Sequence, residues 1–118
     1  MKKITLSLIC LALSLASSAQ DNCASALTVI KGATTTVGTI NGAADNTCGW
    51  TTAGTAGEWY IYTATGDGAI KVSSNLTDNA GQDTRVSIYI GSCAGLTCLA
   101  ANDDVAGANY LSEVTFPS

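Results

Sequence analysis

Four oxygen-bearing side chains, those of Asp83, Asn102, Asp103 and Asp104, form the group of residues in this sequence with the clearest potential for chemistry. Asp83 opens a predicted strand, and residues 102–104 follow a later pair of cysteines, so the fold expected below brings the two groups together. Calcium is the natural ligand, because it binds about six to eight carboxylate, amide and carbonyl oxygens. The alternative is structural, since Asp and Asn also favour turns by hydrogen-bonding to nearby backbone.

Catalysis finds no support in the residue types present. The chain contains no histidine that could act as a base, and no serine or threonine stands beside a recognisable activating group. Paired carboxylates can act as acid and base on a glycosidic bond, but adjacent acids in a loop, such as Asp103 and Asp104, more often bind an ion or are simply hydrated. We therefore expect a protein that is not an enzyme.

The first residues have the three parts of a secretory signal peptide. Lys2 and Lys3 precede an apolar stretch at residues 4–15, and the small residues Ser17 and Ala19 suit cleavage after Ala19. The stretch is shorter than the roughly 20 residues that a membrane-spanning helix needs, and no second apolar run follows. We predict a signal peptide over residues 1–19, a secreted or cell-surface product and no membrane insertion after signal removal.

Four cysteines remain once Cys10 has left with the signal peptide, namely Cys23, Cys48, Cys93 and Cys98. An even number of cysteines in an exported chain indicates disulfides. Three pairings are possible for four cysteines. We favour Cys23–Cys48 with Cys93–Cys98, because each bond joins neighbours in the sequence.

The mature chain is acidic. Three of the five basic residues remain after signal removal, against nine acidic ones, so the net charge is 3 − 9 = −6. Nucleic acid and anionic lipid are therefore disfavoured as partners, whereas cations and neutral ligands are compatible with this charge.

The mature chain is rich in Thr, Ala, Gly and β-branched residues and poor in Leu, Glu, Lys and Arg, which is typical of strands and turns. Alternating apolar residues predict strands that are bounded by Gly, Asn or Asp, at residues 27–30, 34–40, 58–64, 69–74, 84–90 and 113–116. The alternation places Trp59 and Ile61 inward and, in the strongest strand, Val86, Ile88 and Ile90. The turn at residues 65–68 favours an antiparallel hairpin. Many short strands of this kind predict an all-β fold, an antiparallel β-sandwich, over residues 20–118. The last strand has no partner after it, so we expect an incomplete module.

Three segments carry a family resemblance: Asp21-Asn22-Cys23-Ala24-Ser25-Ala26, residues 58–64, and the long run from Asp83 to Asp104. Together they resemble the jelly-roll modules of secreted Bacteroidetes proteins, which are related to bacterial pre-peptidase C-terminal (PPC) domains and distantly to CUB domains. The resemblance implies a β-sandwich that accompanies peptidases, adhesins or repeats. It also implies calcium at Asp83, Asn102, Asp103 and Asp104, as in CUB-like relatives. The family's last strands are absent here.

Three functions are compatible with these features. The first is a non-catalytic binding or adhesion module, stabilised by calcium, from the N-terminal region of a larger secreted protein, whose partner is an extracellular protein or glycan. The second is an accessory domain of an exported peptidase or other hydrolase. The third is a carbohydrate-binding module that uses Trp50, Tyr60 and Tyr62, although a tryptophan beside Cys48 also suits packing on a disulfide.

Overall fold

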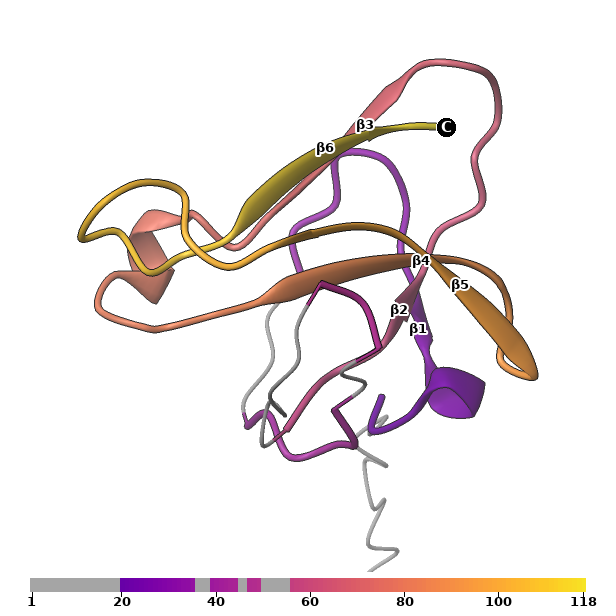
Figure 1. Cartoon of the computed structure of the whole chain (residues 1–118), viewed down its shortest axis with the longest axis horizontal. Coiled ribbons are helices and arrows are strands. Elements are labelled where there is room, and N and C mark those ends of the chain that lie inside the picture. The colour runs from indigo at the N-terminus through magenta and orange to yellow at the C-terminus, as the bar shows by residue number, and fades with distance from the viewer. Residues whose placement is uncertain (1–19, 36–38, 45–46, 50–55) are drawn as a thin grey trace, which may run out of the picture.

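A computed structural model of the chain describes residues 20–35, 39–44, 47–49 and 56–118. The predicted signal peptide, Trp50 and the middle of the predicted strand 34–40 lie outside these residues. The regular elements of the described chain are mostly strands, with almost no helix (Figure 1). This confirms the expected all-β class. No helix in these ranges has the length and apolar character needed to cross a bilayer.

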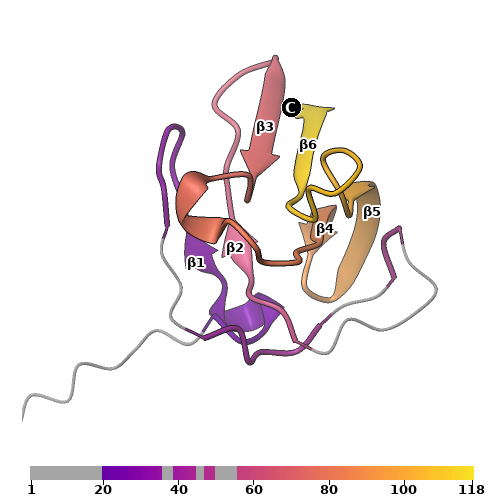
Figure 2. The same ribbon diagram turned by 90° about the vertical axis from the view of Figure 1, so that its left-hand side faces the viewer.

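The elements are short and connected by long loops. They follow the order η1 (Cys23–Ser25), β1 (Leu27–Thr28), β2 (Tyr60–Ile61), β3 (Ala69–Ser73), η2 (Thr77–Asn79), β4 (Val86–Ser92), β5 (Gly95–Asn102) and β6 (Glu113–Pro117), where η marks a single turn of 3₁₀ helix. Across the described residues the strands form three two-stranded sheets, which Figure 2 shows as three separate pairs. β1 pairs with β2 in parallel, whereas β3 with β6 and β4 with β5 are antiparallel.

The prediction of an antiparallel hairpin across residues 65–68 is wrong. β2 is paired with β1 instead, because the amides of Leu27 and Val29 donate to the carbonyls of Trp59 and Ile61. The glycine turn has a different partner. Ser118 donates to the carbonyl of Gly68 through its backbone amide, at 2.9 Å, and its side chain donates to that of Gly66, at 2.8 Å. The turn therefore binds the end of β6 and does not fold β3 back onto β2.

The final strand is paired with a strand that lies much earlier in the chain. β6 is paired with β3 over five positions, from Ala69 opposite Pro117 to Ser73 opposite Glu113. This pairing joins segments that lie some forty residues apart in the sequence. It therefore could not be predicted from a turn next to β6. Both figures show the two strands side by side.

The β4–β5 hairpin is the longest paired element, and its second strand was not predicted. Val86 lies opposite Asn102 at the open end, and Ser92 lies opposite Gly95 beside the turn. The register shifts between Ile88 and Tyr89, which marks a β-bulge. Val86 and Ile88 are half-buried, but so are Ser87 and Tyr89 on the opposite face, so burial does not follow the predicted alternation. Ile90 is 53% exposed because it lies towards the tip of the hairpin.

Two disulfides attach distant segments to this hairpin, and the cysteine pairing differs from the one that the sequence favoured. Cys93, in the turn, is bonded to Cys23 of η1, and Cys98 of β5 is bonded to Cys48. The preferred bond between Cys93 and Cys98 is excluded by the strand pairing. Cys98 lies opposite Tyr89, three positions from the pair that flanks the turn, or about 10 Å along the strand. A disulfide requires Cα atoms within about 7 Å of each other.

Cys48 is fully buried beneath the hairpin. Its sulfur lies 3.5 Å from the carbonyl oxygen of Ile88 and 3.4 Å from that of Ala100. The side chain of Ser87 donates to the carbonyl of Cys48 at 3.3 Å. Gly49 follows with a φ of +86°, and a Cβ there would meet the side chain of Ala101. The segment can lie this close to β5 because residue 49 has no side chain.

The apolar interior is small. Among the described residues, the buried side chains are those of Gln20, Cys48, Leu111 and Ser112. Trp59 packs on Tyr89 of β4 with ring centroids 5.8 Å apart, which confirms its predicted packing role. Ile61 is 52% exposed and not buried as predicted, since a ribbon of two paired positions is too short for alternation to decide burial. The two cystines, which close loops of 70 and 50 residues, each contribute about 4 kcal/mol on the chain-entropy account.

Digestion with trypsin under non-reducing conditions tests the disulfide pairing. Cleavage after Lys31, Lys71 and Arg85 leaves Cys93 and Cys98 together on the C-terminal peptide. We expect this peptide to be linked to both the peptide of Cys23 and that of Cys48, as one three-peptide species by mass spectrometry. Release of a C-terminal peptide with an internal disulfide would contradict the structure. A further cut at Leu96 assigns the individual bonds.

The β3–β6 pair carries an ion pair whose effect depends on pH. Lys71 Nζ lies 2.8 Å from Glu113 Oε1, and Ser73 donates to the other carboxylate oxygen at 3.0 Å. Lys71 and then Ser73 hydrogen-bond to the carboxylate and hold the pKa of Glu113 below its usual value. The stability that this provides is present above the pKa of Glu113 in the unfolded chain, and is lost as the pH falls through the lower folded pKa.

We therefore expect Lys71→Ala to reduce stability slightly at neutral pH, and the difference from the parent to vanish in acid. Urea unfolding at about pH 7 and about pH 3 measures this. Lys31→Ala is the matched control, because Lys31 is an exposed lysine in a turn away from this pair. An equal effect of Lys71→Ala at both pH values would contradict the assignment.

Candidate functional site

The predicted acidic residues meet at the open end of the β4–β5 hairpin. One carboxylate oxygen from each of Asp83, Asp103 and Asp104 lies within 4.8 Å of the others. Asp103 is half-buried, and the other two are exposed. We call these three residues the acidic cluster. Its members come from two segments that are about twenty residues apart in the sequence.

Strand pairing explains why the cluster forms. Val86 at the start of β4 lies opposite Asn102 at the end of β5. In an antiparallel pair the start of one strand and the end of the other share an edge. The residues just before β4 and just after β5 are therefore neighbours, and in this chain both sets are acidic.

The donor geometry fits a calcium ion. Oxygens that bind calcium lie about 2.3–2.6 Å from the ion, so two of them can be at most about 5 Å apart. The oxygens of the acidic cluster satisfy this limit. Carboxylates are hard ligands, and their negative charge suits a divalent cation. The residues that would hold calcium are Asp83, Asp103 and Asp104.

Arg85 provides one positive charge beside the cluster. Its Nε lies 3.3 Å from Asp103 Oδ1, and both side chains are more than a third exposed to solvent. An exposed pair of this kind contributes about 0–1 kcal/mol. Three carboxylates and one guanidinium leave a net charge of −3 + 1 = −2 at this end of the hairpin, so the local field still favours a cation.

Asn102, the fourth predicted ligand, uses its side chain to hydrogen-bond to the backbone on both sides of the loop. Its Oδ1 accepts from the backbone amide of Glu113 at 2.9 Å, and its Nδ2 donates to the carbonyl of Asp104 at 3.2 Å. The side chain therefore joins the end of β5 to the start of β6 and holds the loop that carries Asp103 and Asp104.

Three hydroxyl residues, Ser74, Thr84 and Ser112, form a hydrogen-bonded group behind the acidic cluster, here called the hydroxyl cluster. Ser74 Oγ and Thr84 Oγ1 are 2.6 Å apart, and Thr84 Oγ1 lies 3.0 Å from Ser112 Oγ. Ser112 is fully buried. Its hydroxyl donates to the carbonyl oxygens of Thr84 and of Asp103, the latter at 2.6 Å.

The hydroxyl cluster fixes the acidic residues through the backbone. Thr84 follows Asp83 directly, and the carbonyl that Ser112 contacts belongs to Asp103 itself. One buried side chain thus ties the two acidic segments together. Reasoning from the sequence missed this cluster, because isolated serines and threonines in a chain rich in both carry no signal of their own.

The predicted aromatic site is only partly described, because Trp50 lies outside the described residues. Tyr60 is 40% exposed, and its hydroxyl accepts from the Gln20 side-chain amide at 3.1 Å. Tyr62 is half-buried. The hydroxyl of Tyr60 thus serves the fold by satisfying a buried amide.

Comparisons with known proteins add no family assignment. No protein-family model, curated protein or solved structure matches the chain.

Removal of the Ser112 hydroxyl tests the framework of the site. Ser112→Ala leaves two carbonyl oxygens in a buried environment without their donor, and we expect a loss of about 1–3 kcal/mol in the free energy of unfolding. Ser92→Ala, at an exposed position at the end of β4, should change stability by less than about 0.5 kcal/mol. Equal effects of the two substitutions in urea unfolding would show that the hydroxyl cluster does not hold this end of the molecule.

Proposed function

We propose that the chain is a non-catalytic, extracellular binding or adhesion module that is stabilised by calcium. In this proposal its paired strands belong to a jelly-roll β-sandwich of the PPC-like and CUB-like type. The observation that carries the proposal is the convergence of Asp83, Asp103 and Asp104 at one end of the hairpin. An acidic concentration at a loop end is the arrangement that calcium binds.

Three further features support the proposal. The two cystines suit an oxidising compartment outside the cytoplasm. The chain has no histidine and its four described cysteines are all in disulfides, so the usual nucleophiles and bases are scarce. The resemblance of residues 83–104 to secreted modules supports the same role.

Calcium should raise the melting temperature, because a ligand that binds only the folded state stabilises it by mass action. Extracellular calcium sites have dissociation constants of about 0.1–1 mM, so about 10 mM calcium should add about 1.4–2.7 kcal/mol. For a domain of this size that corresponds to an increase of at least about 5 °C. Thermal unfolding followed by circular dichroism measures the shift.

Two variants make the test specific. Asp103→Ala removes a half-buried member of the acidic cluster and should abolish the calcium shift. Asp67→Ala removes an exposed carboxylate in the glycine turn and should retain it. No shift in the parent protein, or the same shift in both variants, would refute calcium stabilisation through this cluster.

A further inference from the structure

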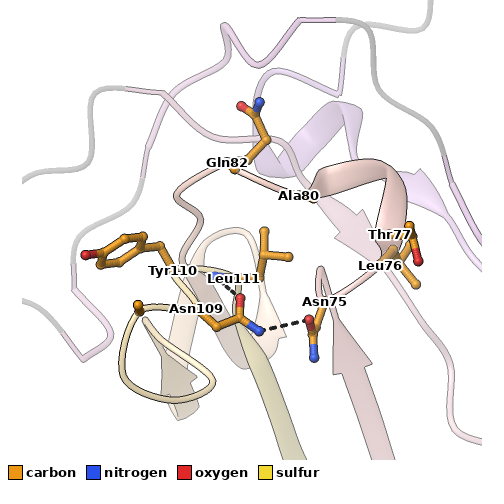
Figure 3. A pocket seen from close by; sticks show the side chains of 10 residues that line it. Asn75, Leu76, Thr77, Ala80, Gln82, Asn109, Tyr110 and Leu111 are labelled. Atoms are coloured by element: carbon orange, nitrogen blue, oxygen red, sulfur yellow. Dashed lines mark hydrogen bonds between the residues drawn. The ribbon is translucent and has the colours of Figure 1, made fainter.

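A cavity of about 390 Å³ lies at the same end of the molecule as the acidic cluster. Its walls come from residues 75–77 and 80–82, in the segment that connects β3 to β4 through η2, and from residues 108–111, which lead into β6. Figure 3 shows Tyr110 on one side of the cavity, Leu76 and Thr77 on the other, and Leu111 between them. Its volume is in the range that small ligands occupy in proteins.

The lining has a distinct chemistry, because none of the lining residues is charged. Three carboxamides, those of Asn75, Gln82 and Asn109, offer both donors and acceptors. Tyr110, which is 53% exposed, presents an aromatic ring with a polar hydroxyl. Leu111 is almost fully buried and forms an apolar floor. A ligand that fits this set is neutral, rich in hydroxyl groups and apolar on one face.

The walls of the cavity are held in place by the protein itself. Asn109 Nδ2 donates to Asn75 Oδ1 at 3.1 Å, and Asn109 Oδ1 accepts from the backbone amide of Leu111 at 3.2 Å. The backbone amide of Thr84 donates to the carbonyl of Tyr110 at 2.9 Å and so connects the two walls. A site with fixed walls loses little conformational entropy when it binds a ligand.

Polar groups are left over for a ligand. Across the part of the chain that the structure describes, no hydrogen bond is formed by the Asn75 side-chain NH₂, the Gln82 side-chain amide or the Tyr110 hydroxyl. Figure 3 shows these groups at different edges of the cavity, with the Gln82 side chain far from Asn75 and the Tyr110 ring extending outward from Leu111, so a ligand that reaches all three spans the opening. The acidic residues Asp78 and Asp83 stand next to the lining in the sequence, which disfavours an anionic ligand.

We propose that this cavity binds a neutral saccharide, with the Tyr110 ring packed against the apolar face of a sugar and the amides of Asn75 and Gln82 hydrogen-bonded to its hydroxyl groups. The inference rests on the proposed function as a binding module, and it names the ligand class. It also places the ligand on residues that the sequence did not single out, and not on Tyr60 or Tyr62.

The test is a titration of the disulfide-bonded protein with neutral hexasaccharides of glucose, N-acetylglucosamine, xylose and mannose, each up to about 10 mM, followed by ¹H–¹⁵N NMR. The side-chain amides of Asn75, Gln82 and Asn109 are observed directly. We expect at least one sugar to shift these signals and those of residues 108–111. Tyr110→Ala should weaken that binding by about tenfold or more.

Ile30→Ala is the control, because Ile30 is 74% exposed and lies outside the cavity lining, and it should leave the affinity unchanged. Thermal melting checks that both variants are folded. We expect Tyr110→Ala to fold, because the hydrogen bond from Thr84 is accepted by the backbone carbonyl of Tyr110 and not by its side chain. Absence of shifts with every sugar, or shifts that survive Tyr110→Ala, would overturn the proposal. The calcium shift, measured on the same protein, separates the outcomes: calcium stabilisation without sugar binding removes the saccharide site alone.

Discussion

Two disulfides that close long loops are the constraint on which this structure depends. With few side chains buried among the described residues, apolar burial provides little to hold the segments together. The cystines compensate by fixing both the tip and the middle of the β4–β5 hairpin. Cys23 attaches the N-terminal segment at the turn, and Cys48 attaches the central segment beneath β5. The hairpin is therefore the frame to which the other described elements are connected.

This arrangement separates the stabilised end of the hairpin from the end that carries the candidate sites. Cys93 lies in the turn, whereas Asp83 and Asp103 lie at the opposite end of strands that are seven and eight residues long, or about 20 Å away. Loops at that open end are held by hydrogen bonds and not by covalent bonds. They can differ in sequence without disturbing the disulfide-bonded frame, which is the usual division between a scaffold and its binding loops.

The sequence revealed local features and missed those that depend on long-range pairing. The alternation at residues 84–90 identified β4, and the acids that flank it identified the acidic cluster, because an antiparallel partner brings both ends to one edge. β5 escaped notice since Ala100 and Ala101 give no strong alternation and a bulge interrupts its register. The partners of β2 and β6, and of every cysteine, lie tens of residues away, and no neighbouring turn specifies them.

The hydroxyl cluster explains why the acidic cluster and the cavity occupy the same end of the molecule. Ser112 contacts the carbonyls of Thr84 and Asp103, and the backbone amide of Thr84 in turn donates to the carbonyl of Tyr110. A displacement of Thr84 therefore acts on the residue that follows Asp83 and on the wall that carries Tyr110 at once. Buried hydroxyl networks of this kind are rigid only when every member has its partners. The geometry of the acidic cluster and of the cavity thus depends on the hydroxyl cluster, because the fold has almost no apolar packing that could hold these segments in its place.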